Sequence, residues 1–131
     1  MSNVPADLKY TKSDEWIRVN DDGSILMGIT DYAQSQLGDM VFAEMQEAGQ
    51  TIDADGECGV IESVKAASEV YMPVAGEIIE ANSGIEASPE TINADPYGDG
   101  WLIKIKPSDA SSLEALMDSA AYEAKLAADD H

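Results

Sequence analysis

The stretch that decides the fold is Gly59-Val60-Ile61-Glu62-Ser63-Val64-Lys65-Ala66-Ala67-Ser68-Glu69-Val70-Tyr71-Met72-Pro73-Val74. Its alternation predicts two β-strands that fold back on each other about a point near Lys65 and Ala66. Both faces of the first strand carry polar and apolar side chains, so the pattern leaves open which face is buried. No Asn-Gly or Asp-Gly pair marks the turn. The sequence therefore predicts a hairpin with Lys65 at its tip.

Similar short runs recur along the chain between Gly, Asn, Asp and Pro residues, which is typical of a mainly β domain with many turns. The predicted strands are Trp16 to Val19, Ile25 to Gly28, Val41 to Met45, Gly59 to Val64, Glu69 to Val74, Glu77 to Ala81 and Trp101 to Ile105. The segment from residue 82 to residue 99 is rich in Gly, Pro, Asn and Ser, and predicts a long connection with at most a turn of helix.

Two helices are expected among these strands. Thr30 can cap a short internal helix, which continues through Leu37 and ends at Gly38. Ser111 and Glu114 form a capping-box pattern for a C-terminal helix that should pack on the sheet. The apolar residues of this second helix are Leu113, Leu116, Met117, Ala120, Tyr122 and Ala124.

The size and charge of the chain limit its partners. Its 131 residues fit one domain, so we expect residues 1–131 to form a single unit. Twenty-six acidic residues against seven basic ones give a formal net charge of -19, which repels nucleic acids and anionic membranes. Two interpretations of this acidity stay open: a solvated surface that keeps the protein soluble, or a surface that attracts basic partner enzymes.

The first residues of the chain and its single cysteine indicate the compartment in which the protein resides. The residues after Met1 lack the features of a secretory signal or of an organelle transit peptide. Cys58 is the only cysteine, so no internal disulfide can form, and a reducing compartment fits best. We therefore expect a cytoplasmic protein.

Most reactive sites cannot be built from these residues. The only histidine is His131, the last residue, so Ser-His-Asp and Cys-His arrangements lack their base and zinc lacks ligands. The segment from Asp53 to Glu57 matches only the opening of a calcium loop, which favours a polar turn over a calcium site. No glycine-rich phosphate loop is present. Lys65 remains, and by its local chemistry it is either a solubilising surface lysine or an amine exposed for modification.

Several motifs in a fixed order give this lysine a context. They are Lys9-Tyr10-Thr11 with Glu15-Trp16, Gly28-Ile29-Thr30-Asp31-Tyr32-Ala33-Gln34 with Leu37-Gly38-Asp39, Glu62-Ser63-Val64-Lys65-Ala66, Pro73-Val74-Ala75-Gly76-Glu77 and Asp95-Pro96-Tyr97-Gly98-Asp99-Gly100-Trp101. With them the chain resembles the H protein of the glycine cleavage system from Leu8 to Lys106, and we expect the resemblance to continue to the end of the chain. Biotin carriers typically have methionines on both sides of their lysine, whereas Val64 and Ala66 stand here. The lipoyl domains of 2-oxoacid dehydrogenases usually have an aspartate just before it, where this chain has Val64.

The resemblance implies a fold and a modification. The fold is mainly β, a flattened barrel-sandwich hybrid of the biotinyl/lipoyl carrier type with a short internal helix and a C-terminal helix. Lys65 would carry lipoate through an amide, added by a lipoate ligase or lipoyl transferase that recognises the folded hairpin. Glu62, Gly49 and Gly76 match positions associated with that recognition. Their alternative interpretations are a surface acid and two glycines that permit turns.

The resemblance also implies a groove in which the arm is sheltered from water. Ser13, Glu15 and Glu69 match its lining, and a carboxylate suits it because it can accept a hydrogen bond from a protonated amine. Alternatively, Ser13 and Glu15 merely solvate the start of a strand. Asp14 stands where the family usually has His, and Glu69 where Asp is common, so the groove can differ in shape here.

The function implied is that of the lipoyl carrier of the glycine cleavage system. The arm would take the methylamine group of glycine from a pyridoxal-phosphate glycine decarboxylase to a tetrahydrofolate-dependent aminomethyltransferase, and dihydrolipoyl dehydrogenase would reoxidise it. The chain itself would be a non-catalytic carrier. Two alternatives stay open: a lipoyl relay or interaction module without glycine turnover, and a stand-alone carboxylate enzyme that needs no lipoyl group.

Overall fold

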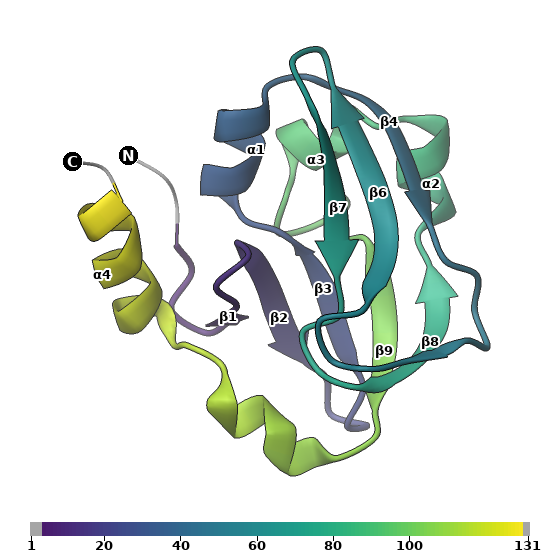
Figure 1. The fold of residues 1–131 in the computed structure, drawn as a ribbon, viewed down its shortest axis with the longest axis vertical. Helices are drawn as coiled ribbons and strands as arrows, with labels where there is room; N and C mark the ends of the chain where they lie inside the picture. The colour runs from purple at the N-terminus through teal and green to yellow at the C-terminus, as the bar shows by residue number, and fades with distance from the viewer. Residues whose placement is uncertain (1–3, 130–131) are drawn as a thin grey trace.

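Two antiparallel β-sheets build the protein in a computed structural model that describes residues 4–129 (Figure 1). The larger sheet has six strands in the order β1-β2-β3-β9-β8-β5, and the smaller has three in the order β4-β6-β7. The strands are β1 (Lys9–Tyr10), β2 (Glu15–Val19), β3 (Ile25–Ile29), β4 (Met40–Met45), β5 (Thr51–Ile52), β6 (Glu57–Ser63), β7 (Ala67–Tyr71), β8 (Gly76–Ala81) and β9 (Ile103–Pro107).

The predicted strands are confirmed to within a few residues at their ends. Alternation explains this in part, because Ile25, Met27 and Ile29, every second residue of β3, enter the main apolar cluster between the sheets. The sequence did not reveal β1 and β5, since two residues are too few to display a period. The acidic segment before β6 is a turn, in which the N–H of Gly56 donates to the carbonyl of Asp53 over 3.0 Å.

The short internal helix is also confirmed. Helix α1 (Asp31–Leu37) begins after Thr30, whose Oγ1 accepts the N–H of Ala33 over 3.2 Å. It ends at Gly38, whose φ of 87° favours glycine. The connection predicted after β8 holds more helix than expected, because it contains both α2 (Ser83–Ala87) and α3 (Thr91–Ala94). Helices this short show no clear period in sequence.

The prediction of one C-terminal helix from Ser111 is wrong. A 3₁₀ helix, η1 (Ala110–Ala115), is followed by an extended residue and only then by α4 (Ser119–Asp129). The carboxylate of Asp109, not Ser111, accepts the first free N–H of η1. The chain then leaves the helix because Met117 exchanges two backbone hydrogen bonds with Tyr10, of 2.8 and 2.9 Å. A pairing this distant in sequence cannot be found from local pattern.

Two apolar clusters hold the elements together. The main cluster lies between the sheets and joins side chains such as Met27 and Ile105 of the larger sheet to Ile61 and Val70 of the smaller. The second cluster lies under α4, and there Tyr122 stacks on Tyr10 with ring centroids 4.7 Å apart. Both parts of the predicted C-terminal helix pack on the protein: Leu113 of η1 enters the main cluster, and Tyr122 and Leu126 of α4 belong to the second. Within residues 4–129, no helix has the length and apolar character needed to cross a bilayer.

Candidate functional site

The turn between β6 and β7 presents Lys65 at the tip of a two-stranded hairpin, which stands at the top of Figure 1. The last registered pair before the turn is Glu62 with Ala67. Ser63 then closes the turn: its N–H donates to the carbonyl of Ala66 over 2.7 Å, and its Oγ accepts the N–H groups of Lys65 and Ala66 over 3.2 and 3.1 Å. The serine hydroxyl thus stabilises a turn that contains no residue of positive φ, so no Asn-Gly pair is needed.

The structure decides which face of the hairpin is buried. Ile61 and Ser63 point into the protein, whereas Glu62 and Val64 point outward. Val64 is 68% exposed, and Lys65 is exposed beside it. The N–H of Val64 donates to the carbonyl of Asp39 over 3.0 Å, which ties the tip to the connection between α1 and β4. The backbone of the turn is therefore fixed on both sides while the Lys65 amine stays accessible.

A cavity of about 310 Å³ lies at the other end of β7, beside the start of β2 and η1. Ser13 and Glu15 both line it, together with Asp55 and Met72. The structure thus brings two of the three predicted groove residues into one cavity. Strand β7 spans the distance from the Lys65 turn, about 13 Å for its four residue steps.

Glu15 is the most unusual side chain in this cavity. It is only 3% exposed, so it does not solvate the strand start. Thr11 Oγ1 donates to its Oε1 over 2.7 Å, and the N–H of Tyr71 donates to its Oε2 over 3.4 Å. Burial raises the pKa of Glu15 to about 7, and the nearby charges of Asp14 and Asp55 act in the same direction. The cavity therefore holds a carboxyl group that changes charge near neutral pH.

Neither Asp14 nor Glu69, the two residues that depart from the pattern of the resemblance, lines this cavity. Glu69 joins Glu15 through Tyr71, whose hydroxyl donates to Glu69 Oε2 over 2.5 Å. That hydrogen bond and the charge of Glu69 raise the pKa of the tyrosine. Asp14 has a φ of 67° and accepts hydrogen bonds from the Tyr122 hydroxyl over 3.0 Å and from Lys125 Nζ over 3.5 Å. Asp14 thus connects the groove to α4.

The two predicted glycines have separate structural explanations. Gly49 has a φ of 98° in open space, which only the backbone freedom of glycine explains. Gly76 begins β8, and a Cβ there would lie 2.5 Å from the carbonyl oxygen of Lys106. Gly76 therefore serves close strand packing and not a turn. The N–H of Gly49 donates to the carbonyl of Ile78, and Gly76 pairs with Ile52 and Pro107. Neither glycine therefore lies in the hairpin that carries Lys65 and Glu62.

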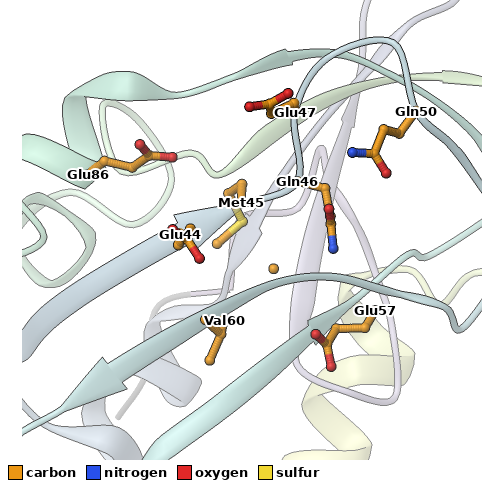
Figure 2. A pocket seen from close by; sticks show the side chains of 9 residues that line it. Glu44, Met45, Gln46, Glu47, Gln50, Glu57, Val60 and Glu86 are labelled. Atoms are coloured by element: carbon orange, nitrogen blue, oxygen red, sulfur yellow. The ribbon is translucent and has the colours of Figure 1, made fainter.

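A second cavity, which the sequence did not reveal, lies along β4 and the start of β6. It measures about 380 Å³, and four carboxylates surround it: Glu44, Glu47, Glu57 and Glu86 (Figure 2). Among the residues that the structure describes, no three His, Cys, Asp or Glu side chains are grouped to hold a metal ion. Cys58 is buried nearby in the core, and burial raises the pKa of its thiol to about 12. We therefore find no reactive thiolate beside this cavity.

Comparison with known proteins gives the family. Residues 8–129 match the profile of the family described as glycine cleavage H-protein. The chain belongs to this family. The matched residues include the hairpin, the strands β1 and β2, which contribute Tyr10 and Glu15 to the cavity, and α4. The resemblance from motifs alone is thereby confirmed over residues 8–129.

Individual relatives of the glycine cleavage H-protein family agree over nearly the whole chain. The glycine cleavage system H protein of Halorhodospira halophila is 52% identical over 130 residues, which cover 99% of each chain. That of Escherichia coli is 56% identical over 126 residues, which cover 96% of this chain and 98% of the other. The crystal structure of the Mycobacterium marinum protein matches with a TM-score of 0.87 at 36% identity, over 95% of this chain and 99% of that one.

Family membership confirms two predictions. The fold is the mainly β barrel-sandwich hybrid of the lipoyl carrier type. The function is that of a lipoyl carrier of the glycine cleavage system, a carrier subunit that works with the other enzymes of that system. The alternative of a relay or interaction module receives no support from these relatives.

Proposed function

We propose that Lys65 carries the lipoyl group and that residues 1–131 form one non-catalytic carrier domain in the cytoplasm. The observation that supports this most is the tip of the hairpin. There Ser63 and Asp39 fix the backbone on either side of an exposed lysine. A lysine on a fixed turn is suited to an enzyme that must bring one amine to an activated acyl group, since little chain entropy is lost on binding.

The residues at the tip fit a covalently bound acid. Lys65 is exposed, so its Nζ can be acylated without rearrangement of the hairpin. Amide formation converts the ammonium into a neutral group and makes the protein one charge unit more negative. When bound, the lipoyl group supplies the disulfide chemistry that this chain lacks.

We assign the cavity beside Ser13 and Glu15 as the shelter for the arm. The ionised form of Glu15 can accept a hydrogen bond from a protonated amine in the cavity, whereas its neutral form would compete as a donor. The pKa of about 7 places the change between the ionised and the neutral form of Glu15 near physiological pH. Glu69 would act by orienting Tyr71, whose backbone N–H contacts Glu15.

The partners that we propose are the other enzymes of the glycine cleavage system. We propose that the carrier serves a pyridoxal-phosphate glycine decarboxylase, an aminomethyltransferase and dihydrolipoyl dehydrogenase. A lipoate ligase or lipoyl transferase would modify Lys65, with Glu62 presented on the outer face of the same hairpin. Gly49 and Gly76 would assist that recognition by preserving the fold, since each has a backbone or packing reason to be glycine.

Peptide mass mapping tests the assignment of Lys65. The purified protein is incubated with a lipoate ligase, ATP and lipoate, and then digested. We expect one lipoyl group on the Lys65 peptide and none in a Lys65→Arg variant. Labelling of Lys104 or Lys9, or labelling that survives in Lys65→Arg, would contradict the proposal. Glycine-dependent exchange of carbon dioxide with the decarboxylase then separates the carrier from a relay, because only the carrier supports exchange.

A further inference from the structure

The side chain of Asn93, in α3, connects three elements around the hairpin tip. Its Oδ1 accepts the N–H of Met40 over 2.8 Å at the start of β4. Its Nδ2 donates to the carbonyl of Gly38 and to Gln34 Oε1 of α1, both over 2.9 Å. All three hydrogen bonds go to the short segment from residue 34 to residue 40.

This segment is the support of the Lys65 turn. Gly38 and Asp39, which we call the platform, lie directly against the tip of the hairpin. The carbonyl of Asp39 accepts the N–H of Val64 over 3.0 Å. A Cβ added to Gly38 would lie 3.6 Å from Lys65 Cε, so the lysine stem passes over a residue that has no side chain.

Hydrogen bonds from Asn93 help to keep the platform in one backbone conformation. Gly38 has a φ of 87° and lies outside the helix it ends, where glycine has many backbone states to choose from. The N–H of Gly38 is held by the carbonyl of Gln34 and Met40 pairs with Ser63. The hydrogen bonds of Asn93 add to these contacts, because they fix the carbonyl of Gly38 and the N–H of Met40 on either side of Asp39. The direction of the Asp39 carbonyl, and with it the position of Val64, is thereby set.

We propose that Asn93 is a positioning residue for the acylation of Lys65, acting through the platform and not by contact with the acyl donor. The inference rests on the proposed function, since it takes Lys65 as the lipoylation site. An enzyme that recognises the folded hairpin binds in proportion to the fraction of molecules whose turn is in place. Loss of the Asn93 contacts lowers that fraction and weakens binding, whereas the chemical step on the bound amine stays the same.

The test compares steady-state lipoylation of Asn93→Ala, Asn93→Asp and the wild-type chain, with a lipoate ligase, ATP and lipoate at saturation. Asn93→Asp keeps the acceptor for Met40 but sets a carboxylate oxygen against the carbonyl of Gly38 and Gln34 Oε1, so it replaces two attractive contacts by repulsive ones. Asn82→Ala is the matched control, because Asn82 also makes three hydrogen bonds, to Gly84, Asp99 and Trp101, away from the platform.

We expect the KM for the carrier to rise about tenfold in Asn93→Ala, the equivalent of about 1.4 kcal/mol, with kcat unchanged. A rise at least as large is expected in Asn93→Asp, because its carboxylate repels the two oxygens that Asn93 Nδ2 contacts. Amide hydrogen exchange at Val64, followed by NMR, should accelerate in both, because its acceptor on Asp39 is no longer held. Asn82→Ala should leave the KM and the Val64 exchange at their wild-type values.

An unchanged KM in a variant whose Val64 amide exchanges faster would overturn the inference, as would an equal rise in Asn82→Ala. If Asn93→Ala does not fold, the same comparison is decided on Asn93→Asp. The proposed function fails separately. It fails when the wild-type protein gains no lipoyl group on Lys65, whereas full labelling of Lys65 with identical KM values contradicts only the role of Asn93.

Discussion

At the scale of single residues, Glu15 is a carboxyl group in the cavity whose charge changes near neutral pH. Its carboxyl group is almost fully buried beside Cys58 and holds two hydrogen bonds, from Thr11 and Tyr71. The two hydrogen bonds favour the charged form, and burial opposes them and dominates. The neutral form is therefore stabilised by folding.

This balance predicts the pH dependence of stability. The pKa of Glu15 is about 7 in the folded protein against 4.5 ordinarily, so the folded state binds more protons than the unfolded state between these values. The free energy of unfolding must fall as pH rises through this window, by up to about 3 kcal/mol. Glu15→Gln, which is neutral at every pH, should remove this fall. Urea unfolding at pH 5 and pH 8 measures the difference.

The control for this prediction is Glu80→Gln, which changes an exposed carboxyl group of the same kind. It should keep the wild-type slope. A wild-type slope in Glu15→Gln would contradict the prediction and would remove Glu15 as the group that titrates near neutral pH.

At the scale of elements, Tyr122 and Lys125 tie α4 to Asp14 beside the cavity, and Tyr122 makes the larger set of contacts. The Tyr122 hydroxyl bonds to Thr30 Oγ1 over 2.7 Å and to Asp14 Oδ1 over 3.0 Å, while its ring stacks on Tyr10. Thr30 is the cap of α1, and Asp14 precedes Glu15 in the chain. One hydroxyl group thus joins the C-terminal helix, the internal helix and the strand that enters the cavity.

We expect Tyr122→Phe to lower the free energy of unfolding by about 1–3 kcal/mol, because the ring remains packed while two buried or half-buried partners lose a hydrogen bond. Urea denaturation is the measurement. The comparison is Tyr71→Phe, which loses an exposed hydrogen bond to Glu69 and should cost less. Equal costs in the two variants would show that the Tyr122 hydroxyl does not anchor α4.

The elements also show what the sequence could and could not predict. The hairpin and α1 were predictable, because alternation and the pair Thr30 and Gly38 are local signals. The break between η1 and α4 was not, since it depends on the distant pairing of Met117 with Tyr10. The buried face of β6 was also unpredictable, because Ser63 lies inside as a turn residue while the apolar Val64 lies outside.

Only part of the candidate site could be predicted from the sequence. Local chemistry left Lys65 equivalent to any surface lysine, and only the ordered motifs distinguished it. The burial of Glu15 could not be predicted, because it is one carboxylate among 26 acidic residues and nothing local separates it from the others. Asn93 gave no signal at all, since its role depends on three contacts with residues more than 50 positions away.

At the scale of the whole molecule, the net charge of -19 opposes the compact state. Carboxylates gather even within one cavity, where Glu44, Glu47, Glu57 and Glu86 meet (Figure 2). Such repulsion acts over distances that salt screens effectively, unlike hydrogen bonds within the core.

Salt should therefore stabilise the protein. We expect the free energy of unfolding to increase by on the order of 1 kcal/mol in about 1 M NaCl, where the Debye length falls to about 3 Å. Urea midpoints at low and high salt measure the change. KCl should produce the same shift if screening is the cause. A decrease with salt would mean that attractive pairs, such as Asp14 with Lys125, outweigh the repulsion.

The hairpin is held at both ends, by Asp39 at its tip and by Glu15 where β7 reaches the cavity. This changes the thermodynamics of any group attached to Lys65. A fixed anchor confines the group to the volume its own tether can sweep, so it meets the cavity at an effective concentration of about millimolar. Contacts too weak to capture the free molecule from solution would then suffice to retain it. Release to a partner enzyme would require only that the partner offer a slightly better set of contacts.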